Sequence, residues 1–162
     1  MVTQRTYSIL TQLIFFFVLC FQAEASLDLL QGSVEDLKAD RKIDLSIYKG
    51  KPSILTFFQP GCESCHRLIK IFQCIDEKYP GKFNILYFGI FADKVKLTKA
   101  ITEFQIPYPA YYASQELFKK ISRVKYTSYT IITNENGELS GTIGGGLPCK
   151  NLENYLKIQK VL

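Results

Sequence analysis

The chain has 162 residues, a hydrophobic fraction of 47%, a charged fraction of 22% and a formal net charge of +5. This length suits one domain, and the composition is typical of a globular protein and excludes a disordered tail. The basic residues are scattered, with pairs such as Lys119-Lys120 as the longest clusters, so a nucleic-acid-binding protein is not expected.

The first 25 residues have the pattern of an export signal. Arg5 gives a short positive region, residues 9–21 are mostly apolar, and Ala23-Glu24-Ala25 fits a small-x-small cleavage site before Ser26. The apolar run is shorter than the about 20 residues that span a membrane comfortably. We therefore expect a signal peptide at residues 1–25 and one mature domain at residues 26–162. The alternatives are an uncleaved signal that tethers the protein to the membrane and lipidation of Cys20.

Cleavage would leave four cysteines, namely Cys62, Cys65, Cys74 and Cys149. Export implies a compartment in which disulfides persist, with the periplasm as the first choice. Four cysteines allow three pairings, so a purely structural role is open at this point.

The predicted elements begin with a buried strand and an amphipathic helix. Residues 53–58 form a nearly continuous apolar run, as in a buried strand of a parallel or mixed sheet. After Cys65, apolar side chains recur with the helical period until Pro80-Gly81 ends the helix. The later predicted elements are a strand at 83–91, a helix at 94–104, a short strand at 110–113, a helix at 115–122, strands at 129–133 and 139–143, and a helix at 152–161. The last two strands flank Asn134-Glu135-Asn136-Gly137, which is a strong hairpin signal. This order predicts a mixed α/β sheet flanked by helices.

The run Gly61-Cys62-Glu63-Ser64-Cys65-His66 carries the chemistry. A Cys-x-x-Cys in the first turn of a helix places both sulfurs near unpaired backbone N–H groups, which stabilise a thiolate. The thiolate is the attacking species in disulfide exchange. We expect Cys62 to be the more exposed sulfur and to attack the substrate, and Cys65 to resolve the mixed disulfide.

Glu63, Ser64 and His66 are the candidate tuning residues. Glu63 places an anion beside the nucleophile and disfavours its thiolate, whereas His66, one turn after Cys62, favours the thiolate when protonated. A weakly stabilised thiolate makes the dithiol the better reductant, so we expect a reductant or isomerase in preference to a strong oxidant.

The same residues match the Cys-x-x-Cys-His attachment motif of c-type haem. His66 is the only histidine, and Met1, the only methionine, would leave with the signal. Neither His/Met nor bis-His ligation would then be available, and no cofactor is expected. A closed zinc site would need a second pair of ligands elsewhere, and no metal site is predicted. The alternatives that stay open are copper handling and a purely structural Cys62–Cys65 bridge.

Four sequence features occur together between about residues 43 and 157. They are Lys49-Gly50-Lys51-Pro52 before the first buried strand, Phe57-Phe58 ahead of the dithiol, the Cys62–Cys65 helix start, and the hairpin at 130–137. In these features the chain resembles the TlpA/ResA-like branch of the thioredoxin superfamily. The resemblance implies a thioredoxin-like fold with an extra strand and helix between its βαβ half and its hairpin, for which residues 94–122 have room. It also implies an exported thiol–disulfide oxidoreductase that reduces or exchanges protein disulfides, in several relatives for cytochrome c maturation, and that receives electrons from an upstream thiol donor.

The chain departs from the family pattern at two places. The Trp usually found before the first cysteine is replaced within Phe58-Gln59-Pro60-Gly61, and the usual cis-proline position falls on Ser128. The resemblance implies that Thr127-Ser128-Tyr129 occupies the place of the loop that holds substrate in the family. A non-proline cis bond costs about 2.5–4 kcal/mol, so we expect a trans bond at Ser128. The missing proline supports an alternative function, a non-catalytic copper-binding or partner-docking module on a thioredoxin scaffold.

The other two cysteines have competing interpretations. Cys74 lies nine residues after Cys65, about 180° around the helix, and is expected to be a small apolar residue under the last helix. Cys149 follows Gly144-Gly145-Gly146-Leu147-Pro148 and is a candidate accessory thiol near the dithiol, as the family fold implies. A Cys74–Cys149 bridge is the further option.

Overall fold

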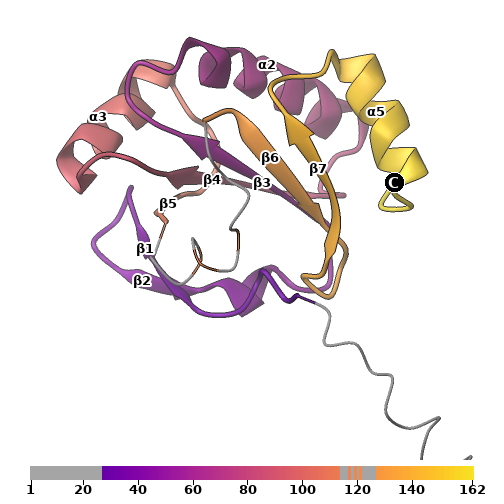
Figure 1. Ribbon diagram of the computed structural model, residues 1–162, viewed down its shortest axis with the longest axis horizontal. Helices are drawn as coiled ribbons and strands as arrows, with labels where there is room; N and C mark the ends of the chain where they lie inside the picture. The colour runs from indigo at the N-terminus through magenta and orange to yellow at the C-terminus, as the bar shows by residue number, and fades with distance from the viewer. Residues whose placement is uncertain (1–26, 114–116, 118, 120, 122–126) are drawn as a thin grey trace, which may run out of the picture.

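The computed structural model describes residues 27–113, 117, 119, 121 and 127–162. Within them, seven strands form one sheet in the order β2-β1-β5-β4-β3-β6-β7. The strands are β1 (Ser33–Asp36), β2 (Lys42–Asp44), β3 (Ser53–Phe58), β4 (Asn84–Gly89), β5 (Ala110–Tyr112), β6 (Tyr129–Thr133) and β7 (Leu139–Gly144). The helices are η1 (Leu45–Tyr48, a 3-10 helix), α2 (Glu63–Lys78), α3 (Lys94–Phe104) and α5 (Cys149–Ile158) (Figure 1).

The strand pairing confirms the predicted mixed sheet. Strand β3 pairs parallel with β4 from Ser53↔Asn84 to Phe58↔Gly89, and β5 pairs parallel with β4. Strand β6 pairs antiparallel with β3, and β7 with β6. The carboxyl ends of β3 and β4 and the beginning of β6 therefore lie at the same end of the sheet, which is the end where α2 begins.

Helix α2 forms because its apolar residues recur along one face and both of its ends are specified locally. Its buried residues, Cys65, Leu68, Ile69, Phe72 and Ile75, follow the helical period and pack on the sheet. Cys62 is the N-cap, and the helix ends at Lys78, two residues before Pro80.

The three described α-helices cover the same face of the sheet (Figure 1). Leu97 of α3 and Leu152 of α5 join the buried residues of α2 in one core. Helix α5 was predicted at 152–161, but it occupies Cys149–Ile158. Pro148, with φ −51, starts the helix earlier, and Lys160, with φ +56, lies beyond its end.

The opposite face of the sheet is covered by other parts of the chain. Leu29, Leu30 and Leu45 from the N-terminal segment pack there, together with Leu117 and Ile121. The predicted helix at 115–122 lies mostly outside the described residues, and the predicted signal at 1–25 lies wholly outside them. Among the described residues, no helix is long and apolar enough to cross a membrane.

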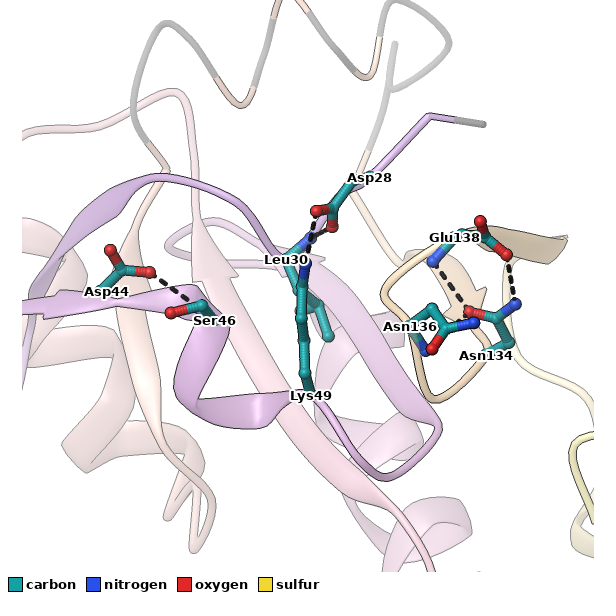
Figure 2. A network of polar contacts seen from close by, with 8 residues as sticks. All are labelled: Asp28, Leu30, Asp44, Ser46, Lys49, Asn134, Asn136 and Glu138. Atoms are coloured by element: carbon teal, nitrogen blue, oxygen red, sulfur yellow. Dashed lines mark hydrogen bonds and ion pairs between the residues drawn. The ribbon is translucent and has the colours of Figure 1, made fainter. Parts of the chain in front are cut away.

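Two groups of polar contacts, one in the N-terminal segment and one in the hairpin turn, lie at the end of β3 away from the dithiol (Figure 2). The Leu29 amide joins the two segments by donating to the Gly137 carbonyl oxygen at 2.8 Å. Asp28 accepts a hydrogen bond from the Leu30 amide at 3.0 Å and pairs with Lys49 at 2.6 Å. Asn134 accepts hydrogen bonds from the amides of Asn136 and Glu138 at 3.0 and 2.9 Å, which shapes the turn. None of these contacts involves the dithiol.

Helix α5 is also fixed to the end of α2 by a charged cluster. Glu153 accepts hydrogen bonds from Lys78 at 2.7 Å, Tyr79 at 2.8 Å and Lys157 at 2.7 Å. The hydrogen bonds from Lys157, Lys78 and Tyr79 lower the pKa of Glu153 to about 2. The two helices therefore remain in contact far from the first turn of α2.

Candidate active site

Cys62 and Cys65 form a disulfide at the first turn of α2, with their Cα atoms 5.3 Å apart. Strand β3 ends at Phe58, and a turn follows in which the Cys62 amide donates to the Gln59 carbonyl oxygen at 3.3 Å. Gly61 has φ +72 in this turn, a left-handed conformation that favours glycine. The strand, the turn and the helix together place the two sulfurs at the carboxyl end of β3.

The helix N-terminus is directed at the first sulfur. The Cys65 amide donates to Cys62 Sγ at 3.3 Å, and the Ser64 hydroxyl lies 3.5 Å from the same sulfur. Both groups can donate a hydrogen bond to a Cys62 thiolate once the disulfide is opened. The geometry therefore supports Cys62 as the sulfur that carries negative charge.

The burial of the two cysteines differs in the predicted direction, although both are more enclosed than the sequence predicts. Cys62 is 6% exposed and Cys65 is 1% exposed, so both belong to the core around α2. The expectation that Cys62 is the more exposed of the two sulfurs is therefore confirmed, although Cys62 is itself buried in the disulfide-bonded state. A substrate has only a small part of Cys62 to reach, and Cys65 is sealed behind it.

Glu63 and His66 are exposed, and their described contacts are to other side chains and not to the cysteine sulfurs. The Glu63 side chain is 91% exposed and lies 3.9 Å from Arg67, so water and a cation weaken its effect on Cys62. The His66 ring is exposed and stacks on Phe104 of α3, with ring centroids 6.3 Å apart. Of the three candidate tuning residues, Ser64 is the one with a described contact to a cysteine sulfur.

The Ser128 loop and Cys65 Sγ both lie beside the Phe57 carbonyl oxygen. The Ser128 amide donates to the Phe57 carbonyl oxygen at 3.0 Å, and Cys65 Sγ lies 3.7 Å from the same oxygen. Since no peptide bond among the described residues is cis, the predicted trans bond at Ser128 is confirmed. Ser128 instead adopts φ +60, a left-handed conformation that is strained for a non-glycine residue.

The three residues of the predicted substrate loop have different surroundings. Thr127 is half-buried and Ser128 is buried. Tyr129 is buried in the core on the opposite face of the sheet, so its side chain does not face the dithiol. The Phe57 carbonyl was not a sequence candidate, because a backbone acceptor leaves no signal in the residue types.

The remaining two cysteines form a second disulfide, Cys74–Cys149, with Cα atoms 6.2 Å apart. Cys149 is therefore not a free accessory thiol in this structure, and that expectation is corrected. The bridge forms because α5 begins at Cys149 itself, next to Cys74, which lies about three turns after the start of α2. The four cysteines that follow the predicted signal peptide were the sequence signal, and the bridge was one of the open options.

No group of three or more His, Cys, Asp or Glu side chains in the described part of the chain is placed so that it could hold a metal ion.

Comparisons with known proteins place these features in a family. Residues 39–160 match the family model of the thioredoxin-like domain. No sequence among the curated proteins matches this chain significantly.

Several solved structures share the fold. A secreted Mycobacterium tuberculosis disulfide oxidoreductase, homologous to E. coli DsbE, is 13% identical with a TM-score of 0.62, covering 83% of this chain and 98% of that one. A thiol:disulfide interchange protein from Chlorobium tepidum TLS is 17% identical with a TM-score of 0.66, covering 79% and 92%. StoA from Bacillus subtilis is 18% identical with a TM-score of 0.60, covering 76% and 94%. At these identities the similarity establishes the fold, and it confirms the predicted α/β thioredoxin-like architecture.

Proposed function

Because this chain belongs to the family of thioredoxin-like domains, we propose that it is a thiol–disulfide oxidoreductase whose working couple is Cys62 and Cys65. One observation carries the proposal: the two cysteines are bonded at the N-terminus of α2, where the Cys65 amide donates to Cys62 Sγ at 3.3 Å. A dithiol in this position gains a stabilised thiolate on one sulfur and a sealed second sulfur close behind it.

The exchange reaction follows from this arrangement. In the reduced protein, the Cys62 thiolate attacks a substrate disulfide, forms a mixed disulfide and releases one substrate thiol. Cys65 then loses its proton and attacks Cys62 Sγ, which releases the second substrate thiol and forms the Cys62–Cys65 disulfide. The substrate gains two electrons and the protein loses two, so a thiol electron donor must reduce Cys62–Cys65 before the next turnover.

We further propose that this protein is exported and that it reduces or exchanges the disulfides of other proteins. The signal pattern of residues 1–25 and the second disulfide support a compartment in which disulfides persist. A structural neighbour is described as secreted, which agrees with export. Mass determination of the protein purified from its native cells tests this part, because cleavage predicts a mature chain that begins at Ser26. Cytochrome c maturation is the proposed pathway, and loss of covalently bound haem from c-type cytochromes after deletion would support it.

Insulin reduction tests the catalytic proposal. The wild-type protein is expected to accelerate insulin reduction by dithiothreitol, whereas Cys62→Ser is expected to show only the rate of dithiothreitol alone. Cys65→Ser is expected to form mixed disulfides and to turn over slowly. A wild-type rate no higher than that of free dithiothreitol would contradict catalysis and would favour the copper-binding or partner-docking alternative.

A further inference from the structure

We propose that Cys74 and Cys149 are positioning residues for this exchange reaction, because their disulfide holds residues 144–148, here called the glycine loop, against the dithiol helix. The fixed loop forms one edge of the site at which a polypeptide substrate binds beside its disulfide. This inference rests on the proposed function and assigns a role to a disulfide that the exchange chemistry does not use.

The first step of the argument is the contact between the glycine loop and α2. The loop connects β7 to Cys149, which is bonded to Cys74, about three turns after the start of α2. A Cβ added to Gly146 would lie 3.3 Å from Ile71 Cδ1 and 3.3 Å from Leu68 Cδ2, so the loop backbone rests directly on α2. The absence of a side chain at Gly146 permits this close approach.

The second step connects the loop to the active site. The Gly145 amide donates to the Ser128 carbonyl oxygen at 3.1 Å. The Ser128 amide donates to the Phe57 carbonyl oxygen, which lies 3.7 Å from Cys65 Sγ. A continuous series of contacts therefore leads from the second disulfide to the first.

The third step concerns how far the Cys74–Cys149 bridge restricts the glycine loop. Three consecutive glycines give the loop more conformational freedom than any other residues would, and Gly145 has φ +76. Helix α5 has independent anchors beyond Cys149, since Leu152 and Leu156 are buried and Glu153 bonds to the end of α2. Loss of the bridge would therefore free the loop more than it would free the helix.

A freed loop affects large and small substrates differently. A polypeptide substrate contacts the surfaces on both sides of Cys62, whereas a small aromatic disulfide needs only the sulfur. Since ordering a mobile loop on binding weakens affinity, we expect the binding of a protein substrate to weaken while the reactivity of Cys62 is retained.

Single-turnover reduction of insulin by the full mature protein tests this inference. The Cys62–Cys65 pair is first reduced in each protein, and mass spectrometry of alkylated peptides verifies that a Cys74–Cys149 bridge, where present, is intact. The insulin concentration that gives half the maximal rate is then measured. In a parallel assay, the rate of reaction with the small disulfide 5,5′-dithiobis(2-nitrobenzoate) is measured. For Cys74→Ser/Cys149→Ser we expect the half-saturating insulin concentration to rise about tenfold and the rate with the small disulfide to stay within about twofold of wild type.

Two further variants keep the test decisive. Gly146→Val retains the bridge but pushes the loop off Leu68 and Ile71, so it is expected to weaken insulin binding in the same way, and it decides the outcome if the double serine variant does not fold. Glu153→Gln weakens the α5 anchor without touching the loop and is expected to leave insulin binding unchanged.

An unchanged half-saturating insulin concentration in Gly146→Val and in a folded double serine variant would overturn the inference. A parallel loss with insulin and the small disulfide would also overturn it, because that pattern indicates general damage. A wild-type protein that reduces neither compound would instead refute the proposed function, so the two failures are distinguishable.

Discussion

The two disulfides are expected to contribute very differently to stability. Cys62–Cys65 closes a loop with a sequence separation of 3, and Cys74–Cys149 one with a separation of 75. In the chain-entropy description, loops of these lengths correspond to about 1.6 and about 4.5 kcal/mol at 25 °C. Domains are commonly stable by only about 5–15 kcal/mol, so removing the second bridge should weaken the fold severely and removing the first should not.

Urea unfolding, monitored by circular dichroism, measures this difference. The wild type is compared with Cys62→Ser/Cys65→Ser and with Cys74→Ser/Cys149→Ser, and midpoint and slope are both fitted because each bridge also restricts the unfolded chain. We expect a loss of less than about 2 kcal/mol for the first variant and about 4 kcal/mol for the second. An equal loss, or a larger loss for the Cys62/Cys65 variant, would refute the assignment of Cys74–Cys149 as the structural bridge.

The remaining predictions concern the Ser128 loop and the α2–α5 cluster. Ser128→Pro is expected to destabilise the fold by about 3 kcal/mol or more, because proline cannot adopt φ +60 and loses the amide that bonds to Phe57. Ser128→Gly, the matched control, should stay within about 1 kcal/mol of wild type in the same urea assay, and equal losses would contradict the strain argument. The pKa of Glu153 falls from 4.5 to about 2 on folding, so its contribution is complete above pH 4.5 and disappears as the pH falls towards 2. Over that range, the melting temperature of the wild type should therefore decrease more steeply than that of Glu153→Gln, and parallel curves would contradict this.

The features that local patterns determine were predictable from the sequence. Strand β3 at 53–58, helix α3 at 94–104 and strand β6 at 129–133 have the predicted bounds. Each of these segments carries its own hydrophobic pattern and end signals. The placement of Cys62 and Cys65 at the start of α2 followed in the same way, and so did the trans bond at Ser128.

The features that depend on contacts between distant parts of the chain were harder to predict from the sequence. The Cys74–Cys149 pairing depends on how α5 lies across α2, and sequence spacing alone left three pairings open. The burial of Cys62 depends on packing in the bonded state, which the exposed helix start did not reveal. The shared role of the Phe57 carbonyl arises only when β6 pairs with β3 and brings Ser128 alongside.

Covalent trapping tests most directly whether Cys62 is the attacking sulfur. Reduced Cys65→Ser and Cys62→Ser proteins are each mixed with a peptide disulfide, and mass spectrometry locates any mixed disulfide. The proposed mechanism predicts a stable adduct on Cys62 in Cys65→Ser and little or no adduct on the sealed Cys65 in Cys62→Ser. An unreactive Cys62 in the first variant, or faster capture by Cys65 in the second, would contradict it.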